Sequence, residues 1–196
     1  MRVDTLASLR AAAFEPPGKR AGGGHETSSR LVGMQIRTAT EADLPGVLEI
    51  HADAVAHSRA IWTDVTPTLE GRREWLTSHQ EARRSAIVAV DGDEVLGYGS
   101  YGPFHAKDGY RHTCENSVYV RPGQQGKGLG RALMAELVER ATRDELHVMV
   151  ALIEAGNEAS VRLHASLGFE DAGVLREVGT KFGEWLDLRY MVRRLA

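Results

Sequence analysis

From residue 34 onward, apolar residues recur with periods that predict a series of separate helices and strands. The first helix is capped by Thr40, and its residues Leu44 and Val47 recur at the spacing of one helical face. Further helices are expected over residues 69–82, 129–143 and 157–167. The last of them is stopped by Gly168.

Other segments show the alternation or the short apolar runs of β-strands, and two of them form a hairpin across residues 91–94. We expect strands over residues 35–37, 86–90, 95–101, 113–120, 147–153, 174–178 and 186–192. The elements then follow the order βααβββαβαββ. This order predicts a single α/β domain, of the α+β kind with a mixed sheet, over residues 34–196.

The first 33 residues lack this periodicity. Pro16, Pro17 and Gly18 interrupt any helical or strand pattern, and three glycines follow at 22–24. A segment of this composition buries too little apolar surface to fold. We therefore expect residues 1–33 to form a disordered N-terminal extension.

The composition of the 196-residue chain excludes several classes of function. With 42% hydrophobic and 26% charged residues, we expect a soluble globular protein with one well-buried core. A formal net charge of -3 offers no field for nucleic acid, and no apolar run is long enough to span a bilayer. The lone Cys114 excludes an internal disulfide, and the eight histidines show no metal-ligand spacing. We expect a cytoplasmic protein with no metal, no nucleic-acid partner and no membrane partner.

The clearest chemical signal lies between Val118 and Arg131, where a predicted strand turns through a Gln-x-x-Gly-x-Gly loop directly into a helix. Gly126, Gly128 and Gly130 have no Cβ, so backbone N–H groups can approach an anion at the helix N-terminus. The helix dipole favours negative charge at the same point. The corner indicates a site for a pyrophosphate-bearing cofactor, and an ordinary tight turn is the alternative.

Two nucleotide motifs do not fit this corner. A dinucleotide fold needs Gly-x-Gly-x-x-Gly, but Arg131 stands where the third glycine should be. A Walker loop needs Lys and Ser or Thr after its last glycine, and Gly128 is followed by Leu129.

The order of elements, with this loop between the fourth strand and a helix, resembles the GNAT superfamily of acetyl-CoA-dependent N-acetyltransferases. The resemblance covers residues 34–196. It narrows to the phosphinothricin and methionine sulfoximine N-acetyltransferases, especially the branch that acetylates methionine derivatives. The stretches that carry it are residues 60–62, 108–120, 148–151, 163–169 and 178–187.

The resemblance implies a central, mostly antiparallel sheet that is splayed between its fourth and fifth strands and flanked by helices. It also implies that acetyl-CoA lies in the splay, with its pantetheine arm pairing with the main chain of Val118, Tyr119 and Val120. The pyrophosphate would lie over the glycine corner, and two further residues would hold the arm. The implied cofactor-binding residues beyond the strand are Gln125, Gly126, Lys127, Gly128, Leu129, Gly130, Arg131, Asn157 and Ser166. The alternative to cofactor binding is a solvated surface position for Lys127 and Arg131 and helix capping for Asn157.

Amine acetylation requires removal of a proton from the acceptor ammonium. Glu115 is the candidate general base, directly or through a water, because its family counterpart occupies the catalytic position. Strand alternation places it on one face with Thr113, Ser117 and Tyr119. A carboxylate in a salt bridge on an edge strand is the alternative.

The oxyanion needs a donor, for which a main-chain N–H near residues 118–120 is expected. Many superfamily members place a Tyr seven residues after an Asn to protonate the leaving thiolate. Here His164 follows Asn157 at that spacing. His164 is a candidate acid or water-orienting group, and a buried structural histidine is the alternative.

The acceptor pocket is expected to contain cations for a carboxylate and an apolar wall for a side chain. Its candidate residues are Trp62, Phe104, Lys107, Tyr110, Arg111 and Thr113. For Trp62 and Phe104 a plain core position is the alternative. At Phe104 and His105 many relatives have Trp and a basic residue, so the sequence departs from the family pattern there.

These residues support three hypotheses. The first is acetylation of the α-amino group of small amino acids such as methionine sulfone, methionine sulfoximine or phosphinothricin, which is detoxification chemistry. The second is acetylation of a peptide or protein N-terminus, and the third is a non-catalytic acyl-CoA-binding module. Relatives of this type form homodimers with acceptor sites near the subunit boundary, so a homodimer is expected.

Overall fold

A computed structural model describes residues 33–195 of the chain. The extension expected over residues 1–33 therefore lies, apart from Gly33, outside the described residues. Within residues 33–195 the strands are β1 (Met34–Thr38), β2 (Ser85–Asp91), β3 (Glu94–Pro103), β4 (Thr113–Val120), β5 (Val148–Glu154), β6 (Glu170–Lys181) and β7 (Glu184–Arg194). The helices are α1 (Leu44–His57), α2 (Leu69–Ser78), α3 (Leu129–Arg143) and α4 (Glu158–Ala165), with short 3₁₀ helices η1 (Glu41–Asp43) and η2 (Asp108–Tyr110). None of the described helices is long and apolar enough to cross a bilayer.

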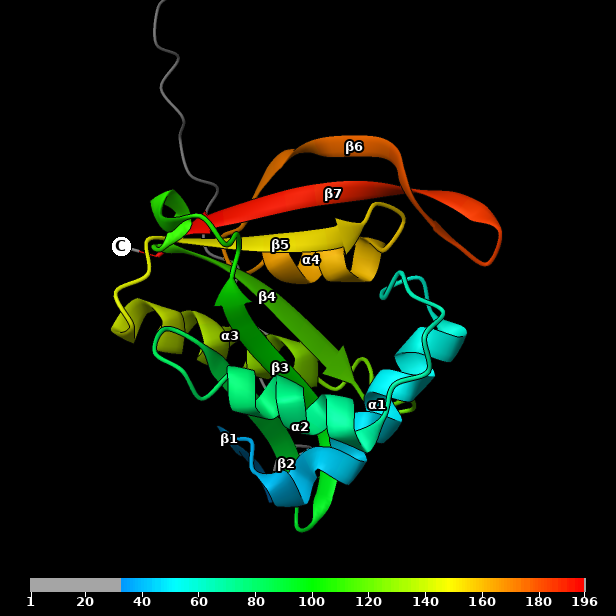
Figure 1. The fold of residues 1–196 in the computed structure, drawn as a ribbon, viewed down its shortest axis with the longest axis vertical. Coiled ribbons are helices and arrows are strands. Elements are labelled where there is room, and N and C mark those ends of the chain that lie inside the picture. The colour runs from blue at the N-terminus through cyan, green and yellow to red at the C-terminus, as the bar shows by residue number, and fades with distance from the viewer. Residues whose placement is uncertain (1–32, 196) are drawn as a thin grey trace, which may run out of the picture. The chain divides into compact units, whose positions relative to one another are not determined.

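The strands form one sheet in the order β1-β2-β3-β4-β5-β7-β6 (Figure 1). Every neighbouring pair is antiparallel except β4 and β5, which are parallel. This confirms the expected mixed sheet and its mostly antiparallel character.

Helices cover both faces of the sheet, and β2 shows how the sequence directs them. Ile87 and Ala89 belong to the core under α3, whereas Val88 and Val90 belong to the core under α1 and α2. Alternate residues of a strand point to opposite faces, so the continuous apolar run of β2 is explained by burial on both sides. In Figure 1, α1 and α2 lie in front of the sheet and α3 behind it.

Two elements differ from the predicted bounds by more than two residues, and several others differ by one or two. Helix α2 ends at Ser78 and not near residue 82, because His79 leaves helical geometry and Arg83 adopts the left-handed region at φ 61°. Strand β6 is much longer than residues 174–178. It is an edge strand, exposed along most of its length and interrupted by two register shifts, so no burial pattern reveals its true ends.

Candidate functional site

Strands β4 and β5 separate part-way along their length. Their parallel pairing joins residues 113–116 to residues 148–151 and then stops, although both strands continue. β3 still pairs with the far side of β4, and β7 with the far side of β5. Half of the peptide groups of residues 117–120 and 152–154 therefore face an opening without a strand partner.

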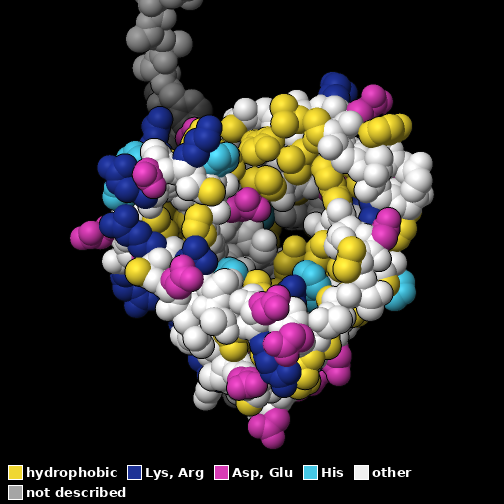
Figure 2. All heavy atoms as spheres, in the orientation of Figure 1, with side chains coloured by type: hydrophobic (Ala, Val, Ile, Leu, Met, Phe, Trp, Pro, Cys, Tyr) yellow, Lys and Arg dark blue, Asp and Glu magenta, His cyan; other side chains and the backbone are white. Residues whose placement is uncertain are grey.

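A cleft of about 80 Å³ occupies this opening. Figure 2 shows the same face hollowed near its centre, below β5 in the orientation of Figure 1. The cleft is lined by Ala60, Asn116, Ser117, Val118, Tyr119, Ala151, Leu152, Ile153, Glu154, Asn157, Ser160 and His164. The sequence-predicted splay is therefore present, with Val118, Tyr119, Asn157 and His164 at its walls.

The glycine corner follows β4 and leads into α3. Gly128 is the residue before α3 and has φ 86°, a left-handed conformation that favours glycine. A Cβ there would meet no atom within 4 Å, so the space around the corner is open. The loop is exposed, and Leu129 anchors the start of α3 in the core. The first-turn N–H groups of α3, which have no partner within the helix, therefore lie beside open space.

The two basic side chains of the corner lie against neighbouring loops. Lys127 Nζ donates to Gln124 Oε1 at 2.7 Å. Arg131 donates to the carbonyl oxygen of Ser166 at 3.3 Å and also contacts the Ser166 hydroxyl. The structure therefore brings Lys127, Arg131 and Ser166 to the corner, with the charges of both cations exposed.

Glu115 lies one residue before the end of the β4–β5 pairing. Cys114 and Asn116, its neighbours, are buried toward α3, so the Glu115 side chain points to the opposite face, as the alternation predicts. Burial raises the pKa of Glu115. β4 is an interior strand and no cation pairs with Glu115 among residues 33–195, so the edge-strand salt bridge does not apply here.

His164 is buried at the end of α4 and is held through both ring nitrogens. Nδ1 lies 2.8 Å from the carbonyl oxygen of Ser160, and Nε2 lies 3.1 Å from the amide nitrogen of Asn116. A carbonyl oxygen only accepts and an amide nitrogen only donates, so these contacts place the proton on Nδ1. Burial lowers the pKa of His164 and favours the same neutral form.

Asn157 is the N-cap of α4, and its side chain accepts a hydrogen bond from the Ser160 N–H at 3.1 Å. Asn157 therefore caps α4, as the alternative proposed, and it also lines the wall of the cleft.

The loop expected to bind the acceptor begins beside β4. The Phe104 N–H donates to the carbonyl of Thr113 at 3.2 Å, and the Phe104 ring packs edge-on against Tyr110 at 5.8 Å. Lys107 and Arg111 are exposed, and the Arg111 guanidinium bonds to the carbonyl of Asp108. The structure thus assembles Phe104, Tyr110 and Thr113 and leaves Lys107 at the surface.

Trp62 lies against a different element. Its indole N–H donates to the carbonyl of Arg59 at 2.8 Å, and its ring covers Gly179 of β6. No hydrogen bond or aromatic ring contact among the described residues joins Trp62 to the loop that holds Phe104.

Three polar residues that the sequence did not predict as part of the site lie on the face of the sheet that carries Glu115. Arg72 and His79 lie on the inward side of α2, with Trp75 between them. A Cβ at Gly102, the ladder partner of Glu115, would lie 3.6 Å from His79 Nε2. His51 of α1 bonds through Nδ1 to the Tyr98 hydroxyl at 2.7 Å. The spacing of Arg72, Trp75 and His79 on one helical face was the available signal.

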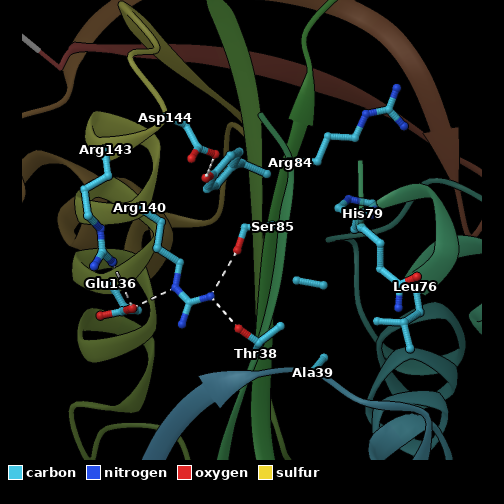
Figure 3. Close-up of a pocket in the computed structure, with 13 residues that line it drawn as sticks. Thr38, Ala39, Leu76, His79, Arg84, Ser85, Glu136, Arg140, Arg143 and Asp144 are labelled. Carbon is cyan, nitrogen blue, oxygen red and sulfur yellow. Dashed lines mark hydrogen bonds and ion pairs between the residues drawn. The ribbon is translucent and has the colours of Figure 1, made fainter. Parts of the chain in front are cut away.

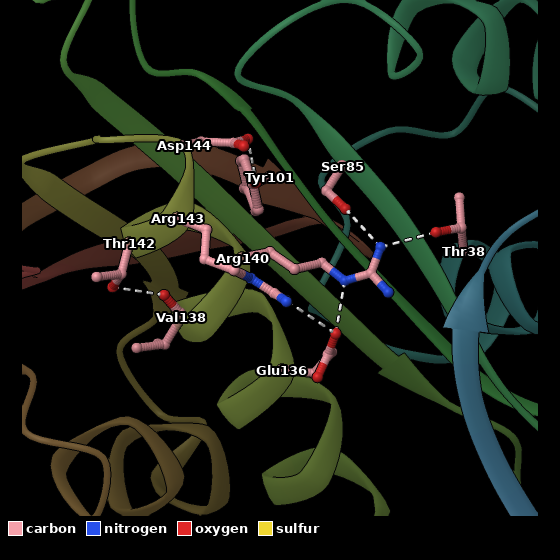
Figure 4. Close-up of polar contacts among 9 residues, drawn as sticks. All are labelled: Thr38, Ser85, Tyr101, Glu136, Val138, Arg140, Thr142, Arg143 and Asp144. Carbon is pink, nitrogen blue, oxygen red and sulfur yellow. Dashed lines mark hydrogen bonds and ion pairs between the residues drawn. The ribbon is translucent and has the colours of Figure 1, made fainter.

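A larger cavity of about 650 Å³ lies elsewhere, between the C-terminal parts of α2 and α3 (Figure 3). Its polar groups satisfy one another. Arg140 binds Glu136 at 2.7 Å and Thr38 at 2.8 Å, and the Tyr101 hydroxyl donates to Asp144 at 2.6 Å (Figure 4). No sequence-predicted site residue lines this cavity, so we place the functional site at the cleft between β4 and β5.

Comparison with known proteins points to one family. The model of the acetyltransferase (GNAT) family matches residues 47–169. The L-methionine sulfoximine/L-methionine sulfone acetyltransferase of Pseudomonas aeruginosa is 50% identical over 157 residues, which cover 80% of this chain and 91% of the relative. The crystal structure of a ribosomal-protein-alanine N-acetyltransferase from Brucella melitensis is 49% identical, with a TM-score of 0.80 over 82% of this chain and 99% of that one. YncA from Salmonella typhimurium, solved with its cofactor acetyl-CoA, is 45% identical, with a TM-score of 0.81 over 84% and 95% of the two chains.

Proposed function

This chain belongs to the GNAT family of acetyltransferases, and we propose that it transfers the acetyl group of acetyl-CoA to the α-amino group of a small amino acid such as L-methionine sulfone, methionine sulfoximine or phosphinothricin. The family and the fold that the sequence resemblance implied are confirmed by the family match and the solved structures. The observation that carries the proposal is the position of Glu115 beside the point where β4 and β5 part, half-buried and without a cation partner among residues 33–195. Such chemistry would detoxify these amino acids.

The described residues fit acetyl-CoA. The open edges of β4 and β5 offer main-chain partners to the amides of a pantetheine arm, in the manner of an added strand. The exposed amides at the start of α3 suit a pyrophosphate, and Lys127 and Arg131 add positive charge beside them. When bound, acetyl-CoA supplies an acetyl group already activated as a thioester.

Glu115 is assigned the removal of a proton from the acceptor ammonium, directly or through one water. An amino acid is mostly protonated on its nitrogen at neutral pH and is not a nucleophile in that form. Because burial raises the pKa of Glu115, its carboxylate is a stronger base than an exposed one.

In this proposal the neutral amine attacks the thioester carbon directly, so that a C–N bond forms and the C–S bond breaks. The thiolate of coenzyme A would leave and take up the proton that the attacking nitrogen releases. The chain's single cysteine, Cys114, is buried toward α3, and burial raises its pKa to about 12. It is therefore a neutral thiol outside the cleft and does not carry the acetyl group.

Main-chain N–H groups of residues 118–120 are assigned the stabilisation of negative charge on the thioester oxygen. His164 is assigned a positioning role, because its Nε2 accepts from Asn116 and its lowered pKa opposes the protonation that a general acid would need. Asn116 is thereby held at the wall of the cleft.

Replacement of Glu115 tests the mechanism. We expect Glu115→Gln to lower kcat/KM for methionine sulfone by about 10²- to 10⁴-fold, because an amide is not a base, while acetyl-CoA affinity by calorimetry is retained. In the parent enzyme, activity should fall as the pH drops through the raised pKa of Glu115, so the acid limb lies above the ordinary carboxyl value of about 4.3. Exposed Glu94 provides the control, Glu94→Gln, which should match the parent.

Two results would contradict this assignment. Unchanged turnover in Glu115→Gln would remove Glu115 from the mechanism. Tight binding of acetyl-CoA with no turnover by the parent on any amine would instead indicate a non-catalytic binding module.

The N-terminus of a peptide or protein is the second acceptor class, and the similarity to the ribosomal-protein-alanine N-acetyltransferase from Brucella melitensis favours it. The same thiol-release assay with a peptide that begins with alanine compares the two classes directly. A larger kcat/KM for the peptide than for methionine sulfone would replace the amino acid as the acceptor.

We also propose that the chain forms a homodimer. The support is a group of exposed apolar side chains on the β6–β7 hairpin, which comprises Val174, Leu175, Val178, Phe182 and Trp185. Several exposed large apolar side chains on one hairpin are typical of a contact site.

A further inference from the structure

Arg72 is a cation without an ion-pair partner in the part of the chain that the structure describes. It lies in the first turns of α2, and its guanidinium carbon stands 5.6 Å from the centre of the Trp75 ring. Its Nε is buried and has no hydrogen-bond partner among the described residues. A buried donor without a partner loses its hydrogen bonds to water and gains none in return, so native proteins rarely keep one without a reason.

The neighbouring arginine differs in this respect. Arg73 lies on the outward side of α2 and pairs with Glu41 at 3.1 Å and Glu70 at 3.2 Å. No ion pair joins Arg72 to a carboxylate of residues 33–195, and its buried Nε has no hydrogen-bond partner there. The partly exposed guanidinium therefore has donors available to a ligand.

The surroundings of Arg72 place it on the acceptor side of the sheet. Its charge contributes, after burial, to the lowered pKa of His51 and of His79, and it acts on the pKa of Tyr119. The charge of Glu115 acts on Tyr119 as well. The ring contacts give the same placement: Trp75, which Arg72 covers, lies 5.7 Å from Tyr98, and Tyr98 stacks on Tyr119 at 5.2 Å. Tyr119 lies on the face of β4 that carries Glu115.

We propose that Arg72 binds the α-carboxylate of the acceptor amino acid and so orients its α-amino group toward Glu115. The inference rests on the proposed amino-acid acetyltransferase function. A planar guanidinium binds a carboxylate through two parallel N–H bonds, which fixes orientation as well as position. Stacking on Trp75 holds the guanidinium plane before the ligand arrives.

This assignment replaces the cations expected from the sequence. Lys107 is exposed, and Arg111 is exposed with its guanidinium bonded to its own loop. Of the three side chains, that of Arg72 is the most restrained, because its Nε is buried and its guanidinium lies over the Trp75 ring.

The test compares two acceptors that differ only in the carboxylate, L-methionine sulfone and 3-(methylsulfonyl)propylamine. We expect Arg72→Gln to raise KM for the amino acid on the order of 10²-fold and to change kcat/KM for the amine by less than about threefold. Arg72→Lys should recover part of the loss, because it restores the charge without the paired donors. Arg73→Gln is the matched control and should leave both acceptors unchanged, since exposed pairs contribute little.

Melting temperature and acetyl-CoA affinity, measured on each variant, separate a binding defect from misfolding. Equal losses on both acceptors, or no loss in Arg72→Gln, would overturn the role of Arg72 while the parent activity leaves the proposed function standing. A parent that acetylates no amino acid would overturn the proposed function and this inference together.

Discussion

His51 shows how burial alters the chemistry of a single residue. Its ring is half-buried between Tyr98 and Tyr119, and burial, together with the charge of Arg72, lowers its pKa to about 4. The unfolded chain takes up this proton near pH 6.5, so it binds more protons than the folded chain between pH 6.5 and 4. The contribution of His51 to stability is thus complete above pH 6.5 and is lost as the pH falls toward 4.

We predict that His51→Gln, which keeps an acceptor for Tyr98 but does not titrate, weakens the acid sensitivity of folding. Because the ring is only partly buried, we expect the parent to lose about 1–2 kcal/mol more than the variant between pH 7 and pH 4. Urea titrations at the two pH values measure the difference. His57→Gln, an exposed histidine on the same helix, should behave as the parent does, and parallel losses in parent and His51→Gln would refute the prediction.

At this scale the sequence was informative where a local rule decides the outcome. Strand alternation predicted the facing of Glu115, because the period of a strand is two whatever the tertiary structure. The partners of His164 and the isolation of Arg72 were not predictable, since they depend on residues from other elements, such as Asn116, 48 positions from His164.

Among the elements, the segment between α1 and α2 docks onto the β6–β7 hairpin. Trp62 covers Gly179, where a Cβ would lie 2.1 Å from the ring carbon Cε3. Lys181 Nζ binds Asp64 at 3.0 Å and also the carbonyl of Thr63. The contact requires a residue without a side chain at position 179.

We predict that Gly179→Ala displaces Trp62 and lowers stability by about 1–3 kcal/mol, since a methyl group cannot fit between the ring and the strand. Thermal unfolding and tryptophan fluorescence measure the two effects. Gly109→Ala is the control, because a Cβ there meets no atom within 4 Å and Gly109 does not have a positive φ. A variant with parental melting temperature and emission would contradict the packing described here.

Element bounds were predictable where glycine, proline or a change of periodicity marks the ends of an element. Strand β4 and helix α3 begin and end where the sequence places them, at residues 113–120 and 129–143. The contact of Trp62 with Gly179 carries no local signal, because the two residues lie far apart in sequence and glycine has several other uses.

For the molecule as a whole, the exposed apolar side chains of the β6–β7 hairpin predict self-association. Trp185 is 69% exposed and Val178 is 51% exposed. Exposing apolar side chains of this size to water is unfavourable in free energy, and contact with a second chain would remove that exposure. We expect light scattering to give about twice the chain mass of 21.4 kDa. The double variant Val178→Glu with Trp185→Glu should shift the protein to the monomer.

Val65→Glu provides the comparison, because Val65 is 73% exposed but lies outside the hairpin. It should leave the dimer intact. A parent protein that is monomeric at all concentrations would contradict the proposed homodimer.

The opening between β4 and β5 is bounded by peptide groups, which every residue carries. Recognition through such groups is indifferent to side-chain identity, apart from proline, which has no N–H to offer. Side chains at residues 117–120 and 152–154 can therefore change during evolution while the main-chain groups that would bind an extended molecule stay in place. Related proteins can then keep the same chemistry although their sequences differ along the opening.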